Sequence, residues 1–78
     1  MDKGEFATMG FKVDDKVEWD WGQGTAEGRV KETHEKKITR KIKGSEVTRN
    51  GSSDDPAIVI EQEDGDEVLK LASELRHK

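Results

Sequence analysis

Asp15-Lys16-Val17-Glu18-Trp19-Asp20-Trp21 is the clearest structural signal in the chain. Its apolar residues, Val17, Trp19 and Trp21, recur at every second position with charged residues between them. A period of two is typical of a half-buried β-strand, because successive side chains of a strand point to opposite faces. Gly22-Gln23-Gly24 then gives the backbone the freedom for a tight turn. We therefore predict that a β-hairpin begins with this segment.

The chain that follows adds further short strands. Residues 25–35 resume the extended pattern, and Gly28 is the expected position of a bulge that bends the second strand. Residues 36–49 predict a long, solvent-facing hairpin that turns at Gly44-Ser45. A loop rich in turn-forming residues then leads to Ala57-Ile58-Val59-Ile60, a short apolar run that predicts the central strand.

The C-terminal segment fits two structures. Asp64-Gly65 is typical of a hairpin turn, which would lead into a last strand at residues 67–71. The apolar positions of residues 67–76 also fit one face of a helix, with Asp66 available as its N-cap. An isolated helix of this length is marginal in water, so tertiary contacts must decide. Periodicity alone leaves strand and helix open.

Length and composition limit the class of protein. The chain has 78 residues, 29% of them apolar and 41% charged, which suffices for one domain with a thin core. The absence of cysteine excludes disulfides and thiolate metal sites. No apolar run approaches the length of a membrane span, so we expect a cytoplasmic protein without membrane contact. Gly4-Glu5-Phe6 resembles a cloning scar and Met9 a natural start, so we expect a tag at residues 1–8 and a single domain at residues 9–78.

Several short motifs occur in a recognisable order. They are Asp15-Lys16-Val17 with Trp19, Gly28 with Val30, Lys43-Gly44 with Val47 and Arg49, Pro56 with the apolar run after it, and Lys70 with Ser73 and Leu75. Over residues 11–75 they resemble the hypervirulence-associated Tudor-like domain family, small proteins of bacteria and fungi. The resemblance implies a mostly β fold, a small SH3-like, Tudor-type barrel of about five antiparallel strands with a short C-terminal turn or helix. It favours a strand followed by a 3₁₀ turn over a full C-terminal helix.

Two positions depart from the family pattern. Asp14 stands where the family commonly has a glycine, and Ile58 stands where an aromatic residue is frequent. The second departure argues against an aromatic cage in this chain. The resemblance implies a fold and does not by itself supply a mechanism.

Catalytic equipment is not evident in the sequence. His34 and His77 are the only histidines, and neither has a nucleophile or a set of metal ligands at a fixed spacing. An acidic stretch near the C-terminus lacks the ligand spacing of a calcium loop and is explained as a charged turn. Its residues are Glu61, Glu63, Asp64, Asp66 and Glu67. We therefore predict a non-enzymatic domain with no catalytic residue, cofactor or metal.

Trp19 and Trp21 are the first candidate binding residues. A cage for a methylated cation needs several aromatic faces, and beyond residues 1–8 the chain adds only Phe11 to the two tryptophans. The simpler interpretation is that both tryptophans pack on the core or cap its end. If one of them is exposed, it can contact a partner. Protein or peptide binding at Trp19 and Trp21 is our leading hypothesis.

The second hypothesis is weak nucleic-acid binding by the hairpin at residues 36–43. Between Arg29 and Arg49 eight basic residues stand against three acidic ones, whereas the whole chain has a net charge of −4. The residues expected to contact phosphates are Lys36, Lys37, Arg40, Lys41 and Lys43. The alternative is a solvated hairpin whose lysines prevent edge pairing. We expect a monomer under either hypothesis.

Overall fold

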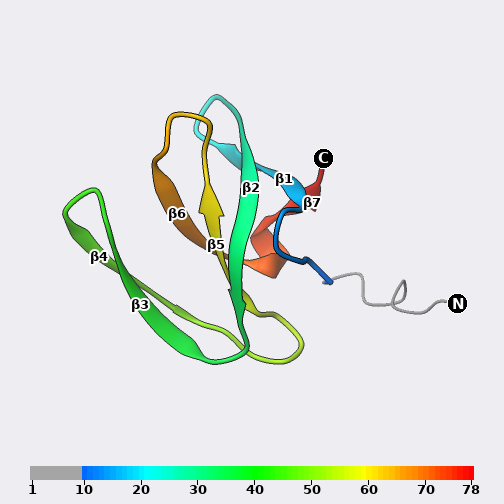
Figure 1. Ribbon diagram of the computed structural model, residues 1–78, viewed down its shortest axis with the longest axis vertical. Helices are drawn as coiled ribbons and strands as arrows, with labels where there is room; N and C mark the ends of the chain where they lie inside the picture. Colours follow the sequence, from blue (N-terminus) through cyan, green and yellow to red (C-terminus); the bar gives the residue numbers. More distant parts are fainter. Residues whose placement is uncertain (1–9) are drawn as a thin grey trace, which may run out of the picture.

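The computed structural model describes residues 10–78, which fold into seven strands in two antiparallel sheets (Figure 1). The strands are β1 (Lys16–Trp21), β2 (Gly24–His34), β3 (Lys37–Ile42), β4 (Ser45–Asn50), β5 (Ala57–Glu61), β6 (Glu67–Leu71) and β7 (Arg76–His77). One sheet has the order β6-β5-β2-β1-β7, and the other is the hairpin β3-β4. The predicted small β barrel is confirmed, with more strands than the five expected. The tag expected at residues 1–8 lies outside the described residues.

β2 joins the two halves of the larger sheet. Its first half pairs with β1 and its second half pairs with β5, and Arg29 takes part in both pairings. Because strands in a sheet are twisted relative to one another, β2 relates β1 and β5 by this twist. The register with β5 shifts between Val30 and Glu32, so a bulge bends the strand at this point.

Gly28 has a different role from the predicted one. The bulge lies beyond this residue, so our placement of the bulge at Gly28 was wrong. A Cβ atom at Gly28 would lie 2.6 Å from Cγ2 of Ile60 and 2.7 Å from the carbonyl oxygen of Glu61. Glycine is therefore required because β2 and β5 approach each other closely where they begin to pair.

β5 is buried on both of its faces. Its first four residues, 57–60, have no exposed surface. Alternate residues face two separate clusters of apolar side chains. The larger cluster contains Phe11, Val17, Trp19, Val30, Ile58, Ile60, Ala72 and Leu75, and the smaller contains Ala57, Val59 and Leu69. Double coverage explains why this strand is a continuous apolar run in the sequence. In the sheet order β2 is central, and β5 lies beside it.

The hairpin β3-β4 covers the smaller cluster. Ile38 and Val47 are half-buried and pack against it together with Leu71. The hairpin stands to one side of the larger sheet, next to β6 (Figure 1). Our prediction of a solvent-facing hairpin is therefore right only for its outer face. Its turn is formed by Lys43 and Gly44, both with positive φ, one residue earlier than predicted.

The C-terminal segment is a strand followed by a turn, as the family resemblance favoured. β6 pairs with β5, and a short 3₁₀ helix, η2 (Ala72–Glu74), follows it. The carboxylate of Asp55 accepts hydrogen bonds from the amide of Ser73 at 2.7 Å and from its hydroxyl at 2.8 Å. The Ala72 amide donates to the Pro56 carbonyl oxygen at 2.8 Å. The chain then adds β7 beside β1, a strand that we did not predict.

Asp14 adopts a backbone conformation that favours glycine, with φ at +79°. Its amide donates to the Val30 carbonyl oxygen at 2.8 Å, which fixes the loop in front of β1 against β2. Glycine enters this region without the steric cost of a Cβ atom. The aspartate thus follows the chain path that the family's glycine would take, at a cost in backbone strain.

Candidate functional site

The two tryptophans of β1 have opposite environments although they share one face of the strand. Trp19 is only 4% exposed and belongs to the larger cluster, whereas Trp21 is 60% exposed. Ala26 lies directly opposite Trp19 on β2, and Gly24 lies opposite Trp21. Because glycine has no side chain, no cross-strand neighbour covers the second indole at this position. Trp19 therefore has little surface for a partner, and Trp21 has much.

A charged cluster lies on the other face of β1. The guanidinium of Arg76 hydrogen-bonds both carboxylate oxygens of Asp20, at 3.1 and 3.3 Å, and Oε2 of Glu18 at 3.2 Å. The hydrogen bond from Arg76 and its positive charge lower the pKa of Asp20. These contacts tie β7 to β1, so the acidic groups beside Trp21 already have a cation within the domain.

A polar hollow of about 360 Å³ lies between β2 and the turn that joins β5 to β6. It is lined by Lys16, Glu27, Gly28, Arg29, Glu61, Gln62, Glu63, Gly65 and Lys78. Three basic and three acidic side chains are among these residues, so the lining has no net charge. Nζ of Lys78 lies 2.7 Å from Oε1 of Glu27 across it.

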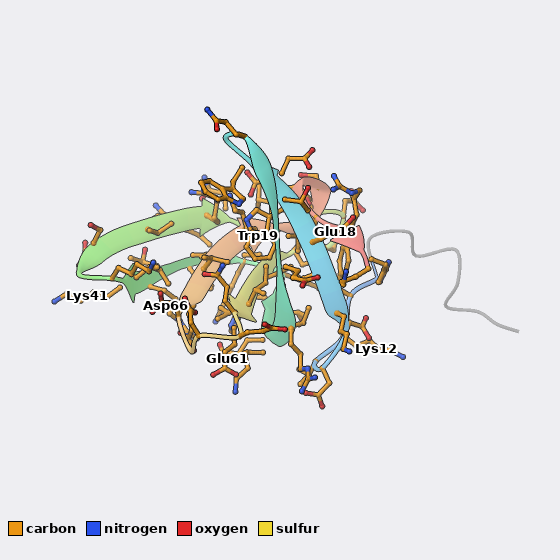
Figure 2. The ribbon with its side chains drawn as sticks, turned by 90° about the horizontal axis from the view of Figure 1, so that it is seen from above. Lys12, Glu18, Trp19, Lys41, Glu61 and Asp66 are labelled. Carbon is orange, nitrogen blue, oxygen red and sulfur yellow. The ribbon has the colours of Figure 1, made fainter. Side chains whose placement is uncertain are left out.

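The structure does not bring the five predicted phosphate-binding residues to one surface. Nζ of Lys43 lies 3.0 Å from Oδ2 of Asp66 in the β5-β6 turn, and Arg40 pairs with Glu32 of β2. Lys37 and Lys41 are exposed on the outer face of β3, and Lys36 is exposed in the bend before it. Figure 2 shows Lys41 toward the tip of the hairpin, apart from Glu61. Two of the five cations are thus engaged within the domain.

Glu32, His34 and Arg40 form a half-buried polar cluster that links the hairpin to β2. Oε1 of Glu32 lies 2.7 Å from Nε2 of His34 and also accepts a hydrogen bond from Arg40. The hydrogen bond with His34, and then that with Arg40, lower the pKa of Glu32. No nucleophile lies within this set of contacts, so the cluster is best explained as a link between strands.

The acidic stretch behaves as the charged turn that we predicted. Glu61 pairs with Lys31 at 3.5 Å, and Asp66 pairs with Lys43. Within residues 10–78, no group of His, Asp or Glu side chains is arranged to hold a metal ion. His77, which we left without a role, stacks on Phe11 with ring centroids 4.3 Å apart.

Sequence reasoning found Trp21 but missed the hollow. Trp21 lies in a clear strand pattern, and only its exposure could not be predicted. The hollow depends on Glu27 and Arg29 meeting both Lys78 and the β5-β6 turn, which are distant in the chain. None of its charged residues forms a motif, so the sequence carried no signal for it.

The comparisons with known proteins agree with this architecture. Residues 14–75 match the family model described as the hypervirulence-associated proteins Tudor domain. Neither the search of curated proteins nor that of solved structures gave a significant match. No helix in the described part of the chain is long and apolar enough to cross a membrane. Because this match spans most of the chain, the protein belongs to the hypervirulence-associated Tudor domain family.

Proposed function

We propose that this domain is a non-enzymatic interaction module that binds a protein or peptide segment, with Trp21 as an anchor. The main support for this proposal is that Trp21 is 60% exposed, whereas Trp19 on the same strand is buried. Membership of a Tudor-like family supports a binding module. The fold holds the indole on regular structure, so little conformational entropy is lost when a partner covers it.

The physical case rests on the surface that Trp21 offers. An indole combines a large apolar area with an N–H donor, and tryptophan is enriched among residues that dominate binding energy. Val13 is the other large hydrophobic residue that is strongly exposed among residues 10–78, at 56%. It precedes β1, whereas Trp21 ends that strand. The two residues therefore allow a matched comparison of two exposed apolar sites.

Selection from a displayed library of random linear peptides tests the proposal. We expect peptides that bind the domain and whose amide and indole shift changes in ¹H–¹⁵N spectra centre on Trp21. Trp21→Ala should weaken the binding of these peptides about thirtyfold or more while the spectrum stays dispersed, because hot-spot truncations cost about 2 kcal/mol or more. Val13→Ala is the control and should bind as the parent does. A library that yields no binder, or equal losses for both variants, would contradict the proposal.

Weak nucleic-acid binding by residues 36–43 is the second candidate. Its support is that Lys36, Lys37 and Lys41 are exposed and have no ion pair within 4 Å among the described residues. Binding through about three phosphate contacts would be weak and would fall steeply with salt. Filter binding of a short single-stranded RNA at low and at physiological salt tests this candidate. Retention at low salt that collapses at physiological salt, and that Lys37→Gln with Lys41→Gln abolishes, would rank it above peptide binding.

A further inference from the structure

The edge of β2 that pairs with β5 from Arg29 onward has no strand beside it in the first part of β2. The amide of Val30 donates to the Asp15 carbonyl oxygen at 2.9 Å, and the Val30 carbonyl accepts from Asp14. Both backbone groups of Val30 thus point toward the β1 side. Because backbone groups of alternate residues in a strand point to opposite edges, those of Thr25 and Glu27 point away from β1.

β5 does not reach the part of this edge that Thr25 and Glu27 occupy. Its pairing with β2 begins at Arg29, opposite Glu61. Beyond Glu61 the chain turns on itself: the Gln62 amide donates to the Asp66 carbonyl oxygen at 2.7 Å. The turn therefore satisfies its own backbone groups. Among the described residues, the two N–H and two C=O groups of Thr25 and Glu27 have no strand partner.

The polar hollow lies along this open edge. Glu27, Gly28 and Arg29 form its β2 wall, and the turn after β5 forms the opposite wall. A volume of about 360 Å³ is near the lower end of the range for ligand pockets and holds a few side chains. An extended segment of a few residues can enter such a recess.

We infer that an extended segment of a partner protein adds to the edge of β2 as an antiparallel strand, hydrogen-bonded to the backbone of Thr25 and Glu27. The inference rests on the proposed function and specifies how the segment is held. Strand addition takes its affinity from main-chain hydrogen bonds and its specificity from alternate side chains.

The residues on the inner and outer faces of the sheet, next to the open part of β2, indicate which side chains the partner segment carries. Trp21 and the half-buried Ala26 lie on the inner face, so a side chain of the segment that points this way is apolar. Glu27 and Arg29 lie on the outer face, beside Lys78. The lining of the hollow has no net charge, so the flanking side chains are polar rather than strongly charged. The occupant is an extended peptide with an apolar residue between polar ones.

Glu27→Pro tests the inference directly. Proline at this position removes the outward N–H and adds a ring at the open edge. The ladder with β1 keeps its hydrogen bonds, since proline is tolerated where a strand's N–H faces outward. Glu27→Ala is the matched control, because it removes the same carboxylate and its ion pair with Lys78 but keeps the N–H. Peptides selected from the random library should bind Glu27→Pro about tenfold or more weakly than Glu27→Ala, and both variants should keep a dispersed spectrum.

The outcomes separate this inference from the proposed function. If selected peptides depend on Trp21 but bind both Glu27 variants equally, strand addition is wrong and peptide binding stands. If no peptide binds, both fail.

Amide hydrogen exchange gives a readout that does not depend on a folded proline variant. Thr25 and Glu27 should exchange faster than Ala26 and Gly28 in the free domain and should become protected when peptide is bound. Two versions of a bound peptide, one N-methylated at its odd-numbered amides and the other at its even-numbered amides, should differ: one should bind and the other should not. Protection of Thr25 and Glu27 in the free domain, or equal binding of both methylated peptides, would overturn the inference.

Discussion

The hairpins β1-β2 and β3-β4 are built alike but differ in what surrounds them. Both are antiparallel pairs with apolar residues on the inner face, although Arg40 and Arg49 interrupt this face in β3-β4. In β1-β2 the inner residues Val17 and Trp19 are almost completely buried, because β5, η2 and the loop before β1 all contribute to the same cluster. In β3-β4 the inner residues Ile38 and Val47 remain half-buried, because only β5 and β6 lie beneath them.

The two hairpins therefore differ in the surface that they can offer to a binding partner. The sequence suggested β3-β4 as a phosphate-binding surface because of its basic residues. In the structure, however, Arg40 and Lys43 form ion pairs that attach the hairpin to the rest of the domain. β1-β2 ends in an exposed indole and has a part of its edge without a strand partner. We therefore propose the better-anchored hairpin as the binding surface, because its geometry is fixed before a partner arrives.

The largest expected effect compares the inner residues of the two hairpins. Trp19→Ala should lower the free energy of unfolding by about 3–5 kcal/mol, since it leaves a large cavity in the main cluster. Val47→Ala should cost about 1 kcal/mol, because its side chain is smaller and only half-buried. Urea unfolding monitored by circular dichroism measures both. Equal losses would mean that the two hairpins contribute alike to stability.

A second comparison uses backbone strain, since each region has one non-glycine residue with positive φ: Asp14 at +79° and Lys43 at +51°. Asp14→Gly should raise the free energy of unfolding by about 0.5–1 kcal/mol, because it removes the clash of the Cβ atom. Lys43→Gly should gain less, since it also removes the ion pair with Asp66. Asp14→Ala is the control: it removes the same charge but keeps the Cβ atom, so a gain from this variant would contradict the strain argument.

The smallest expected effect concerns pH and the link between the hairpin and β2. The pKa of Glu32 is lowered in the folded state from its ordinary value of 4.5. Its ionised form therefore stabilises the fold above pH 4.5, and this contribution is lost as pH falls below that value. Because Glu32 is 41% exposed, we expect only a few tenths of a kcal/mol. Glu32→Gln should flatten the pH dependence of thermal unfolding below pH 4.5, whereas Glu46→Gln, on the outer face, should flatten it less.

The local pattern of apolar residues predicted most of the strands, but it predicted few of the contacts between them. The alternation at residues 16–21 and the apolar run at 57–60 each specify which faces must be buried, and the structure places both as strands. β7 was missed because Arg76 and His77 have no apolar pattern; they form a strand only because they pair with Val17 and Glu18. The role of Gly28 was misassigned because it depends on β5, which is distant in the chain.

The candidate site was predicted in part for the same reason. Sequence alone identified Trp19 and Trp21 as candidates, but the difference in their exposure depends on which residues of other segments pack against each indole. Trp19 meets the main cluster, and Trp21 extends past it with Gly24 as its neighbour.

The sequence by itself therefore determined the β class and the positions of most strands, because these follow from short-range alternation and turn residues. Its ordered motifs also indicated the family. Only the tertiary structure decided which indole is exposed, which lysines have no ion pair among residues 10–78, and where part of a strand edge remains open. Those properties depend on which distant segments meet, and a strand's own residues do not specify its neighbours.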